Sequence, residues 1–591
     1  MIKDRLGTLA LVLLCVTSVS GERRDGIDGA LIDGPFQVAC GHSLQKIRRE
    51  KDELASMRLQ HNSGIELELA REESESFQLV VIPNERSIQG VEVSIGPLKN
   101  RSGRQLNLRW HRVGYVKSGR PAEYRPEYVG WWPDPLMPPG IFDVAAGEIQ
   151  PLWFTVAADQ QTESGLYQGS ILIRLAEYTQ SVQVTVRVRD FALPRPGTLA
   201  APFGLYRRSI ESWYGQKMAP EEFNEWCQFM AGYRLTPKNL GVEYKKNVRA
   251  PSADSNDGGQ GTVDRVDMTT LRKTVGKMND DFPPYSYGFY RLPGCSSLKQ
   301  RKVDQAAAQR YADVVKMHYD EWRRQGFGEE AYLYGVDEVT RECEDKTRDI
   351  YAAIKRQLPQ VKIMQTLGST LTPKLAGLVD IWCPKTYAVG KTFYDQRRQA
   401  GDTIWLYVCC SPVPPYGNFF VDVPSIDHRI LFWQTKKAAA TGFLYWTVAQ
   451  WDPVDSPASG KPCFPDIPFE ITKQRMYAGP WKVNGDGLLV YPGKNMTPLP
   501  SIRLEVIRDG IEDFEYLALL EKLVNDAEKL PASRQPAQPM IAEARKLCGV
   551  PDRISHSFTE FTKDPELILT RRKQIAEMIE KLDGILTSNQ N

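Results

Sequence analysis

The feature that most constrains this chain is an alternation of short apolar runs and helix-like segments that begins after residue 198. The runs have the length and the aromatic and β-branched content of buried strands, and the segments between them have a helical period. The strand-like runs are 202–206, 284–290, 331–336, 362–366, 379–383, 402–408, 442–446 and 487–491. Roughly eight strands that alternate with helices over about 300 residues predict a TIM-like (β/α)₈ barrel, which we assign to residues 198–525. In such a barrel the functional residues follow the carboxyl ends of the strands.

Residues 22–195 carry a different pattern. Strand-like runs begin near residue 64, and the segment up to residue 190 contains no convincing helix. The clearest half-buried strand alternates valines with polar residues: Val182, Val184, Val186 and Val188. We therefore predict a β-sandwich, joined to the barrel by a proline-containing linker at 193–197. The aromatic and proline-rich stretch 128–136 is predicted to be a loop that packs against the sandwich edge rather than reaching the barrel.

The chain becomes helical and charged after residue 501. Helical periods cover 502–524, 539–547 and 564–586, and we expect the first of these helices to complete the barrel. Residues 526–591 form the predicted C-terminal helical extension. The acidic residues near the start of the 502–524 helix are expected to be solvated or capping charges. The predicted fold class is multidomain, with an all-β sandwich, an α/β barrel and terminal helices.

The charge balance and the hydropathy pattern exclude two classes of protein. The 75 Lys and Arg nearly balance the 73 Asp and Glu, giving a net charge of +2, so a dedicated nucleic-acid binder is not expected. No stretch beyond the N-terminal segment is apolar for long enough to insert into a membrane as a helix.

The N-terminus has the pattern of a secretory signal peptide, which we assign to residues 1–21. Basic residues precede an apolar run, 6–16, that is too short to cross a bilayer, and small residues suited to cleavage follow at 18–20. Cys15 follows the bulky Leu14, so lipoprotein processing is not expected. We expect export to the periplasm or to the outside of the cell.

The remaining cysteines are scattered. Of the 10 cysteines, all but Cys15 lie after the predicted signal peptide, and this odd number leaves at least one thiol without an intramolecular partner. No CxxC pair occurs, so a zinc site is not predicted. One or two disulfides are plausible in an exported protein, but their pairing stays open. No metal or other cofactor is implied.

Two adjacent acids, Asp337 and Glu338, follow the apolar and aromatic run 332–336. They could cap the next predicted helix, 345–357, because acids favour a helix N-terminus. They could instead be catalytic carboxylates at the carboxyl end of a barrel strand. Since side chains alternate along a strand, both acids can serve one site only if they lie beyond its last regular residue.

Adjacent acids suit one glycosidase mechanism better than another. Two-carboxylate glycosidases usually take their acids from separate strands, about 5–5.5 Å apart in retaining enzymes. In substrate-assisted hydrolysis the 2-acetamido oxygen of the sugar attacks the anomeric carbon, one acid stabilises the acetamido group, and the other protonates the leaving oxygen. Asp337 would be the stabiliser and Glu338 the general acid/base.

Several stretches carry a resemblance to a known family. They are 334–338 (Tyr-Gly-Val-Asp-Glu), 442–446 (Gly-Phe-Leu-Tyr-Trp), 451–453 (Trp-Asp-Pro) and the long charged run 501–516. Together these stretches resemble the catalytic domain of glycoside hydrolase family 123, and the stretches 76–79 and 130–136 resemble its N-terminal β-sandwich. The resemblance implies a β-N-acetylgalactosaminidase that acts by substrate assistance through the Asp-Glu pair. The family's pair is often followed by Pro, where Val339 stands here.

Five further residues are candidates for substrate binding. Tyr387 and Trp446 follow or end barrel strands and could line a pocket for the acetamido group, with wall packing as the alternative. Arg207 could hydrogen-bond sugar hydroxyls through its planar guanidinium, or it could lie on the surface. Tyr407 and Asn418 flank a proline-rich loop on the same face of the barrel.

Two other functions stay open beside the leading one. A two-carboxylate glycosidase acting on a sugar without an acetamido group would draw its second acid from Asp380, Asp422 or Asp452. A chain that kept the barrel but lost turnover would be a carbohydrate-binding protein. The leading prediction is a secreted, exo-acting N-acetylhexosaminidase with a glycan as its partner.

Overall fold

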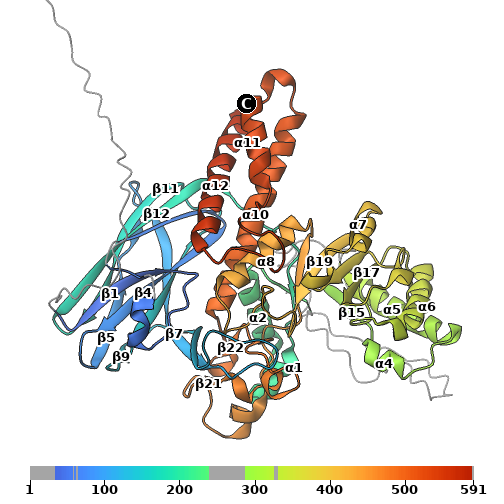
Figure 1. Ribbon diagram of the computed structural model, residues 1–591, viewed down its shortest axis with the longest axis horizontal. Helices are drawn as coiled ribbons and strands as arrows, with labels where there is room; N and C mark the ends of the chain where they lie inside the picture. The colour runs from blue at the N-terminus through green and yellow to red at the C-terminus, as the bar shows by residue number, and fades with distance from the viewer. Residues whose placement is uncertain (1–33, 57–58, 62–63, 239–285, 325–330, 589–591) are drawn as a thin grey trace, which may run out of the picture.

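The computed structural model describes residues 34–56, 59–61, 64–238, 286–324 and 331–588. The predicted signal peptide lies outside these residues. A sheet-rich region and an α/β region lie on opposite sides of a set of long helices (Figure 1). Within the part of the chain that the structure describes, no helix is long and apolar enough to cross a membrane.

The N-terminal region is a system of thirteen strands. Twelve of them come from the first part of the chain: β1 (Phe36–His42), β2 (Gln60–His61), β3 (Ile65–Arg71), β4 (Glu73–Pro83), β5 (Ile88–Ile95), β6 (Leu98–Lys99), β7 (Gln105–Lys117), β8 (Trp131–Met137), β9 (Phe142–Val144), β10 (Gln150–Ala158), β11 (Gly165–Leu175) and β12 (Tyr178–Ala192). The main path runs β2-β1-β4-β10-β7-β6-β11-β12-β3, antiparallel except for the last pair. The thirteenth strand, β21 (Phe469–Glu470), comes from the barrel segment and pairs in parallel with β7.

The two faces of this strand system enclose one apolar core. Its members come from β4, β10, β11 and β12 on opposite sides: Phe77, Leu79, Phe154, Val156, Ile171, Ile173, Val182, Val184, Val186 and Val188. The valines of β12 are at most 2% exposed, while the residues between them are polar and more exposed. This period-2 burial is that of a sandwich strand, as the valine series predicts.

The second sheet has eight parallel strands, which follow one another around a ring in the order of the chain. They are β13 (Pro202–Phe203), β14 (Thr236–Pro237), β15 (Gly288–Arg291), β16 (Tyr332–Tyr334), β17 (Lys362–Leu367), β18 (Ile381–Pro384), β19 (Thr403–Val408) and β20 (Gly442–Tyr445). β20 returns to pair with β13, and Gly288 N–H donates to the Lys238 carbonyl (3.3 Å) where β14 and β15 meet. Alternate side chains such as Tyr332, Met364 and Trp405 fill the interior of this curled sheet.

One predicted barrel strand was wrong. Residues 487–491 lie outside the ring, and Tyr491 belongs to a two-stranded ladder of β22 (Tyr491–Pro492) and β23 (Pro498–Leu499). The run is apolar because it is buried against other groups, including the Trp451 indole, which donates to the Val490 carbonyl (2.9 Å). The strand that the sequence analysis missed is β14, whose two residues show no apolar period.

Helices follow most strands of the ring. α1 (Arg207–Tyr214) and α2 (Pro220–Gly232) follow β13; α4 (Cys295–Lys299) and α5 (Gln305–Arg324) follow β15; α6 (Arg341–Gln357), α7 (Thr392–Gln399) and α8 (Ile426–Lys437) follow β16, β18 and β19. The chain then forms α9 (Arg475–Ala478), α10 (Ile502–Lys529), α11 (Gln538–Cys548) and α12 (Pro565–Ser588). Both α11 and α12 pack against α10, so the terminal helices are attached to the molecule in part through α10.

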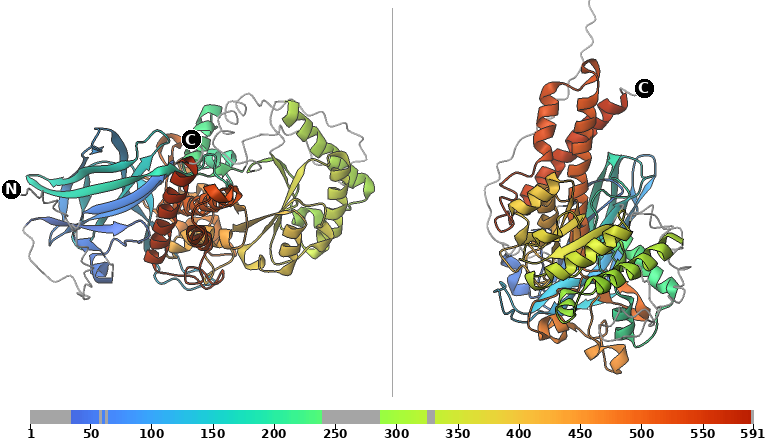
Figure 2. Two further views of the ribbon diagram at one scale, coloured as in Figure 1. Left: turned by 90° about the horizontal axis from the view of Figure 1, so that it is seen from above. Right: turned by 90° about the vertical axis from the view of Figure 1, so that its right-hand side faces the viewer.

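The 28-residue helix α10 lies between the sandwich and the barrel (Figure 2). It contacts α8 of the barrel region and strands β4 and β8 of the sandwich. Its residues from Ile502 to Leu517 are all buried. Because apolar and charged residues are buried around its whole circumference, α10 behaves as a core helix rather than as one face of the barrel wall.

The acids in the first half of α10 are buried, which corrects the expectation that they are solvated or capping charges. They belong to what we call the α10 charge cluster: Glu73, Glu75, Arg429, Glu505, Arg508, Asp509, Glu512, Asp513 and Arg572. Arg429 donates to both oxygens of Asp513 (2.6 and 2.8 Å). Burial alone would raise the pKa of Glu505, but Arg508 and Arg109 lower it to about 2. The expectation failed because the partners come from distant parts of the chain.

The stretch 128–136 is also corrected by the structure. Most of it forms β8, which pairs antiparallel with β7 and reaches α10 instead of packing only at the sandwich edge. Asp134 accepts from Arg503 Nε and Nη2 (2.9 and 2.8 Å), and both side chains are 0% exposed. A buried carboxylate in this strand therefore requires the cation from α10.

Candidate active site

A cavity of about 480 Å³ opens at the carboxyl ends of β16, β19 and β20. Asp337 and Glu338 line it from the loop after β16, and Tyr407 lines it from β19. Trp446 follows β20, and Trp481, which is 49% exposed, follows α9. Because the strands of the ring are parallel, their carboxyl ends bring these residues to one end of the barrel.

Asp337 is held through both carboxylate oxygens. Its Oδ1 accepts from the Tyr334 hydroxyl (2.9 Å) and the Thr366 hydroxyl (3.1 Å). Its Oδ2 accepts from Arg291 Nη2 (3.0 Å), and the Arg291 guanidinium also lies over the Tyr334 ring. The side chain of Asp337 remains 39% exposed, so a fixed carboxylate faces the cavity.

Glu338 lies where the chain leaves the strand and turns. Its φ of 45° is in the left-handed region, which is unusual for a residue with a side chain and is typical of strained functional positions. Its N–H donates to Thr366 Oγ1 (3.3 Å). Its Oε1 accepts from the Tyr407 hydroxyl (2.6 Å) and from Lys385 Nζ (3.0 Å). The turn lets two consecutive acids serve one cavity, which a regular strand would prevent.

The donors around Glu338 keep their protons. Burial and then the charge of Glu338 raise the pKa of Tyr407 well above its ordinary value. Burial alone would lower the pKa of the Lys385 ammonium, but Cys409 and Glu338 raise it above its ordinary value. A neutral phenol and a charged ammonium therefore meet the same oxygen of Glu338 and fix the orientation of its carboxyl group.

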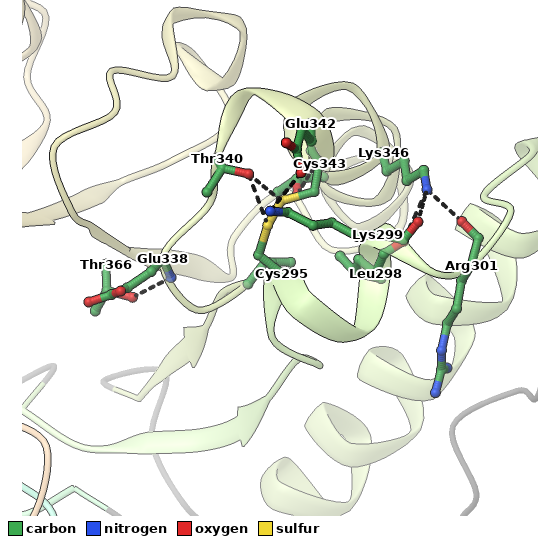
Figure 3. The surroundings of a disulfide bond; sticks show 12 residues. Cys295, Leu298, Lys299, Arg301, Glu338, Thr340, Glu342, Cys343, Lys346 and Thr366 are labelled. Carbon is green, nitrogen blue, oxygen red and sulfur yellow. Dashed lines mark hydrogen bonds and ion pairs between the residues drawn. A yellow bond between two sulfur atoms is a disulfide. The ribbon is translucent and has the colours of Figure 1, made fainter. Parts of the chain in front are cut away.

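A disulfide lies behind the loop that carries the two acids. Cys295 at the start of α4 is bonded to Cys343 in α6 (Figure 3). The Cys295 N–H donates to the Asp337 carbonyl (3.3 Å), and Cys295 Sγ lies 3.4 Å from Thr340 Oγ1. The bond thus links the two helices that flank residues 337–340. This is the one disulfide in the described part of the chain.

The helix-cap interpretation of the two acids is wrong. Helix α6 begins at Arg341, its N-cap is Thr340, and the acids of its first turn are Glu342 and Glu344. The carboxylates of Asp337 and Glu338 bind side chains of other barrel elements instead. The pair therefore belongs to the cavity and not to the helix.

The structure brings some of the predicted substrate-binding residues to the cavity and not others. Tyr407 and Trp446 line it. Tyr387 lies beside it, where burial raises its pKa and the charges of Lys385 and Glu338 act on its hydroxyl.

The other two predicted residues have local roles. Arg207 pairs with Glu211 one turn along α1 (3.2 Å) and donates to the Met218 carbonyl. Asn418 is 1% exposed and donates to the carbonyls of Cys409 (2.9 Å) and Pro412 (2.7 Å), so it shapes the proline-rich loop. Neither residue lines the cavity.

The three acids considered as a second carboxylate are committed elsewhere. Asp380 binds Lys355 Nζ and the Ile363 N–H (both 2.7 Å) at the amino end of the strands. Asp422 accepts from Tyr124 and Asn484 (both 2.7 Å). The side chain of Asp452 accepts from the Arg475 N–H. None of the three lines the cavity that holds Asp337 and Glu338.

Several residues of the site were not predicted from the sequence. Arg291 and Lys385 follow or end short strands and carry the cations beside the two acids. Trp481 supplies an exposed aromatic face at the cavity. Asp486, which is 1% exposed, lines the same cavity from the loop before β22. A polar residue at the end of a predicted strand was the available signal for Lys385, whereas Asp486 lies between two glycines with no such signal.

Comparison with known proteins places the barrel in a family. Residues 305–520 match the model of the glycoside hydrolase 123 catalytic domain. This segment belongs to glycoside hydrolase family 123. The resemblance predicted from the Asp-Glu pair and the 501–516 run is thereby confirmed. A search of curated proteins found no match.

A likeness in fold to a solved structure extends over nearly the whole molecule. The structure of a family 123 glycoside hydrolase from Clostridium perfringens is similar with a TM-score of 0.69, at 14% identity, over 94% of this chain and 100% of that chain. This likeness shows a shared fold. A GH2 β-galacturonidase from Eisenbergiella tayi matches at a TM-score of only 0.32 and 10% identity, over 81% of this chain and 73% of that chain.

Proposed function

We propose that this family 123 protein is an exo-acting β-N-acetylgalactosaminidase that works by substrate-assisted, retaining catalysis. The observation that carries the proposal is the pair Asp337–Glu338, two consecutive acids that line one cavity and are held by separate sets of donors. Substrate assistance needs two acids of different roles close together, and it needs no second carboxylate from across the site.

Asp337 is the proposed stabiliser of the acetamido group. As the 2-acetamido oxygen attacks the anomeric carbon, the acetamido nitrogen gains positive charge and needs an acceptor nearby. The hydroxyls of Tyr334 and Thr366 and the guanidinium of Arg291 hold the Asp337 carboxylate in one orientation. A carboxylate fixed in this way is oriented for that charge before the reaction begins.

Glu338 is the proposed general acid/base. It gives a proton to the leaving oxygen as the glycosidic bond breaks, and it later removes a proton from the water that opens the oxazoline intermediate. Tyr407 and Lys385 bind its Oε1, while its Oε2 makes no hydrogen bond to the described residues and the side chain is 45% exposed. The oxygen without protein partners is the one available to the leaving group.

The aromatic walls support a sugar as the ligand. Trp446 and Trp481 line the cavity, and flat aromatic faces stack against the apolar faces of sugar rings. The similar enzyme from Clostridium perfringens is associated with glycolipid glycan hydrolysis. We therefore propose a terminal β-linked N-acetylgalactosamine of a glycan as the substrate. We also propose that the chain is exported, on the basis of its N-terminal pattern.

The proposal is tested by the choice of substrate. We expect release of the chromophore from an aryl β-N-acetylgalactosaminide, strong inhibition by an N-acetyl thiazoline that mimics the oxazoline, and the β-anomer as the first product by NMR. An aryl β-galactoside without the acetamido group should be hydrolysed at least about 10³-fold more slowly, because the internal nucleophile is missing. Comparable rates on both substrates would favour a two-carboxylate glycosidase. Glycan binding without turnover would favour a carbohydrate-binding protein.

A further inference from the structure

Asp486 occupies a turn that places its side chain under the cavity. Its neighbours Gly485 and Gly487 have φ values of 89° and 76°, which side-chain-bearing residues rarely adopt. A Cβ at Gly487 would lie 2.6 Å from the Trp446 ring, and a Cβ at Gly485 would lie 2.9 Å from Arg503 Nη1. Both glycines are therefore needed for the backbone to bring Asp486 this close to Trp446.

One carboxylate oxygen of Asp486 accepts two hydrogen bonds from protein donors. Its Oδ1 accepts from the Tyr445 hydroxyl (2.8 Å) and from Trp446 Nε1 (2.9 Å). Tyr445 is itself fixed, because its hydroxyl accepts from the Gly487 N–H (2.7 Å). These contacts set the plane of the carboxyl group and tie it to the residue that ends β20.

The other oxygen has no protein partner. Asp486 Oδ2 is buried and makes no hydrogen bond to any described residue, and no cation in the described chain lies within ion-pair distance of this side chain. Leaving a buried carboxylate oxygen without a donor costs free energy, so such an atom calls for a ligand or water that supplies one. The residue lines the cavity that holds Asp337 and Glu338.

We propose that Asp486 Oδ2 accepts a hydrogen bond from a ring hydroxyl of the sugar bound beside Asp337 and Glu338, and that it makes this hydroxyl a requirement of the substrate. This proposal rests on the proposed function, since it assumes that a sugar fills the cavity. Hydroxyl groups are the most numerous hydrogen-bond donors of a neutral glycan. A site that holds a buried acceptor for it discriminates strongly against sugars that lack it, because the acceptor is then left without a partner.

The alternative is a purely structural role, in which Asp486 only positions Trp446. The two roles separate in a double-mutant cycle between enzyme and substrate. In the Asp486→Asn variant the amide oxygen can still accept from Tyr445 and Trp446, while the amide NH₂ replaces the Oδ2 acceptor with a donor. The structural contacts are thus retained and the proposed contact is removed.

The experiment measures kcat/KM of wild type and Asp486→Asn on an aryl β-N-acetylgalactosaminide and on its 3-deoxy, 4-deoxy and 6-deoxy derivatives. We expect one deoxy sugar to lose about 10- to 150-fold in the wild type, the range for a hydrogen bond to a charged group. The same sugar should lose less than about threefold in the variant, since its partner is already gone. The loss should fall mainly on KM if the contact forms equally in ground and transition states.

Asp422→Asn is the matched control. Asp422 is also a buried carboxylate, but both its oxygens have protein partners and it does not line the cavity. Its pattern of losses across the deoxy sugars should match the wild type. A pattern changed equally in both variants would indicate a general effect of removing a buried charge, and would overturn the proposal.

The outcomes distinguish this inference from the proposed function. If the wild type hydrolyses the parent sugar but loses less than threefold on every deoxy derivative, the inference fails and the proposed function stands. If one derivative loses the same factor in the wild type and in Asp486→Asn, another residue binds that hydroxyl and the inference again fails. If the wild type hydrolyses none of the N-acetyl sugars, both fail. The wild-type series alone can reject the inference even if the variant does not fold.

Discussion

Two buried carboxylates, Asp513 in the α10 charge cluster and Asp486 at the cavity, are equally buried and yet differ in their partners. Each is 1% exposed. Asp513 receives two hydrogen bonds from Arg429 and a third from the Trp433 indole (2.8 Å). Asp486 receives neutral donors on one oxygen and has none on the other. The difference teaches that burial alone does not separate the two kinds of acid. Both oxygens of Asp513 have donors, whereas one oxygen of Asp486 has neither a donor nor a cation within ion-pair distance among the described residues.

The same contrast extends to the residues around each acid. In the α10 charge cluster, oxygens that lack a hydrogen bond still lie close to a cation, as Asp509 Oδ2 does at 3.7 Å from Arg429 Nη1. At the cavity, Asp337 and Glu338 remain partly exposed beside their partners. We therefore expect substitutions in the cluster to change the free energy of unfolding, and substitutions at the cavity to change turnover.

The largest effect is expected from substitutions of the two acids at the cavity. Glu338→Gln should lower kcat about 10²- to 10⁴-fold on a substrate with a poor leaving group, and much less on an activated aryl glycoside that needs little protonation. Asp337→Asn should lower turnover on both kinds of substrate, because formation of the oxazoline no longer has its stabiliser. Steady-state kinetics with aryl leaving groups of graded pKa checks this.

The control for these two variants is Asp395→Asn. Asp395 pairs with Arg398 on the surface of α7, with a side chain that is 60% exposed. It should keep wild-type turnover on every leaving group, and all three variants should unfold at the same temperature. Wild-type activity of Asp337→Asn on either kind of substrate, or of Glu338→Gln on the substrate with a poor leaving group, would contradict the assigned roles.

The second prediction concerns a substitution in the α10 charge cluster. Arg429→Met should lower the free energy of unfolding by about 3–5 kcal/mol, because it removes from the buried carboxylate of Asp513 the cation that donates to both its oxygens. The kcat of the folded fraction should be unchanged. Thermal unfolding followed by circular dichroism measures the loss. Lys522→Met, at an exposed pair with Asp526 (2.8 Å), should unfold like the wild type, and an equal loss there would remove the contrast between buried and exposed pairs.

A third change tests the link between the scaffold and the catalytic loop. Cys295→Ser combined with Cys343→Ser removes a bond that spans 48 residues, and should lower stability by about 2–4 kcal/mol. Unfolding of the wild type with and without a reducing agent gives an independent measurement. The double variant should be insensitive to the reductant, and a remaining sensitivity would point to a different disulfide.

The smallest expected effect is a dependence on pH. Burial raises the pKa of Asp486 to about 6, despite hydrogen bonds from Trp446 and Tyr445 and the charges of Arg503 and Lys385. The acceptor form of Asp486 is ionised, so it is present above about pH 6 and is lost as the pH falls below that value. If the sugar binds only that form, kcat/KM should fall about tenfold between pH 7 and 5.

The comparison with Asp486→Asn isolates this limb of the pH profile. Other ionisable side chains also line the cavity, so the wild-type profile alone does not assign the limb. The limb that disappears in the variant belongs to Asp486. A profile that keeps its full acidic limb in the variant would contradict the assignment.

Much of the barrel and the position of the two adjacent acids could be predicted because their signals are local. Buried strands such as β19 and helices such as α6 carry their period in consecutive residues, and Asp337 and Glu338 stand directly after an apolar run. The two-residue strand β14 has no period to detect. Residues 487–491 look like a strand because burial selects apolar residues whichever contacts bury them.

The features that escaped prediction depend on contacts between distant residues. The acids of α10 have the composition of a solvated surface, and only the folded chain shows that Arg429 and Arg572 neutralise them. Arg207 was predicted at the site because it follows the first barrel strand, and Asn418 because it flanks the proline-rich loop, but each binds neighbouring residues of the chain instead. Asp486 could not be recognised because its importance lies in an oxygen left without a donor, which no sequence pattern records.

The position of α10 has a consequence for the order in which the molecule is made. Asp134 precedes its cation Arg503 by 369 residues, and Glu75 precedes Arg572 by 497. At a synthesis rate of about 5–20 residues per second, the first of these gaps lasts roughly 20–75 s. Throughout that interval the strands that carry these acids exist without the charges that neutralise them. We therefore expect the buried ion pairs that join the sandwich to α10 and α12 to form only after most of the last third of the chain has been synthesised, although the sandwich strands are made first.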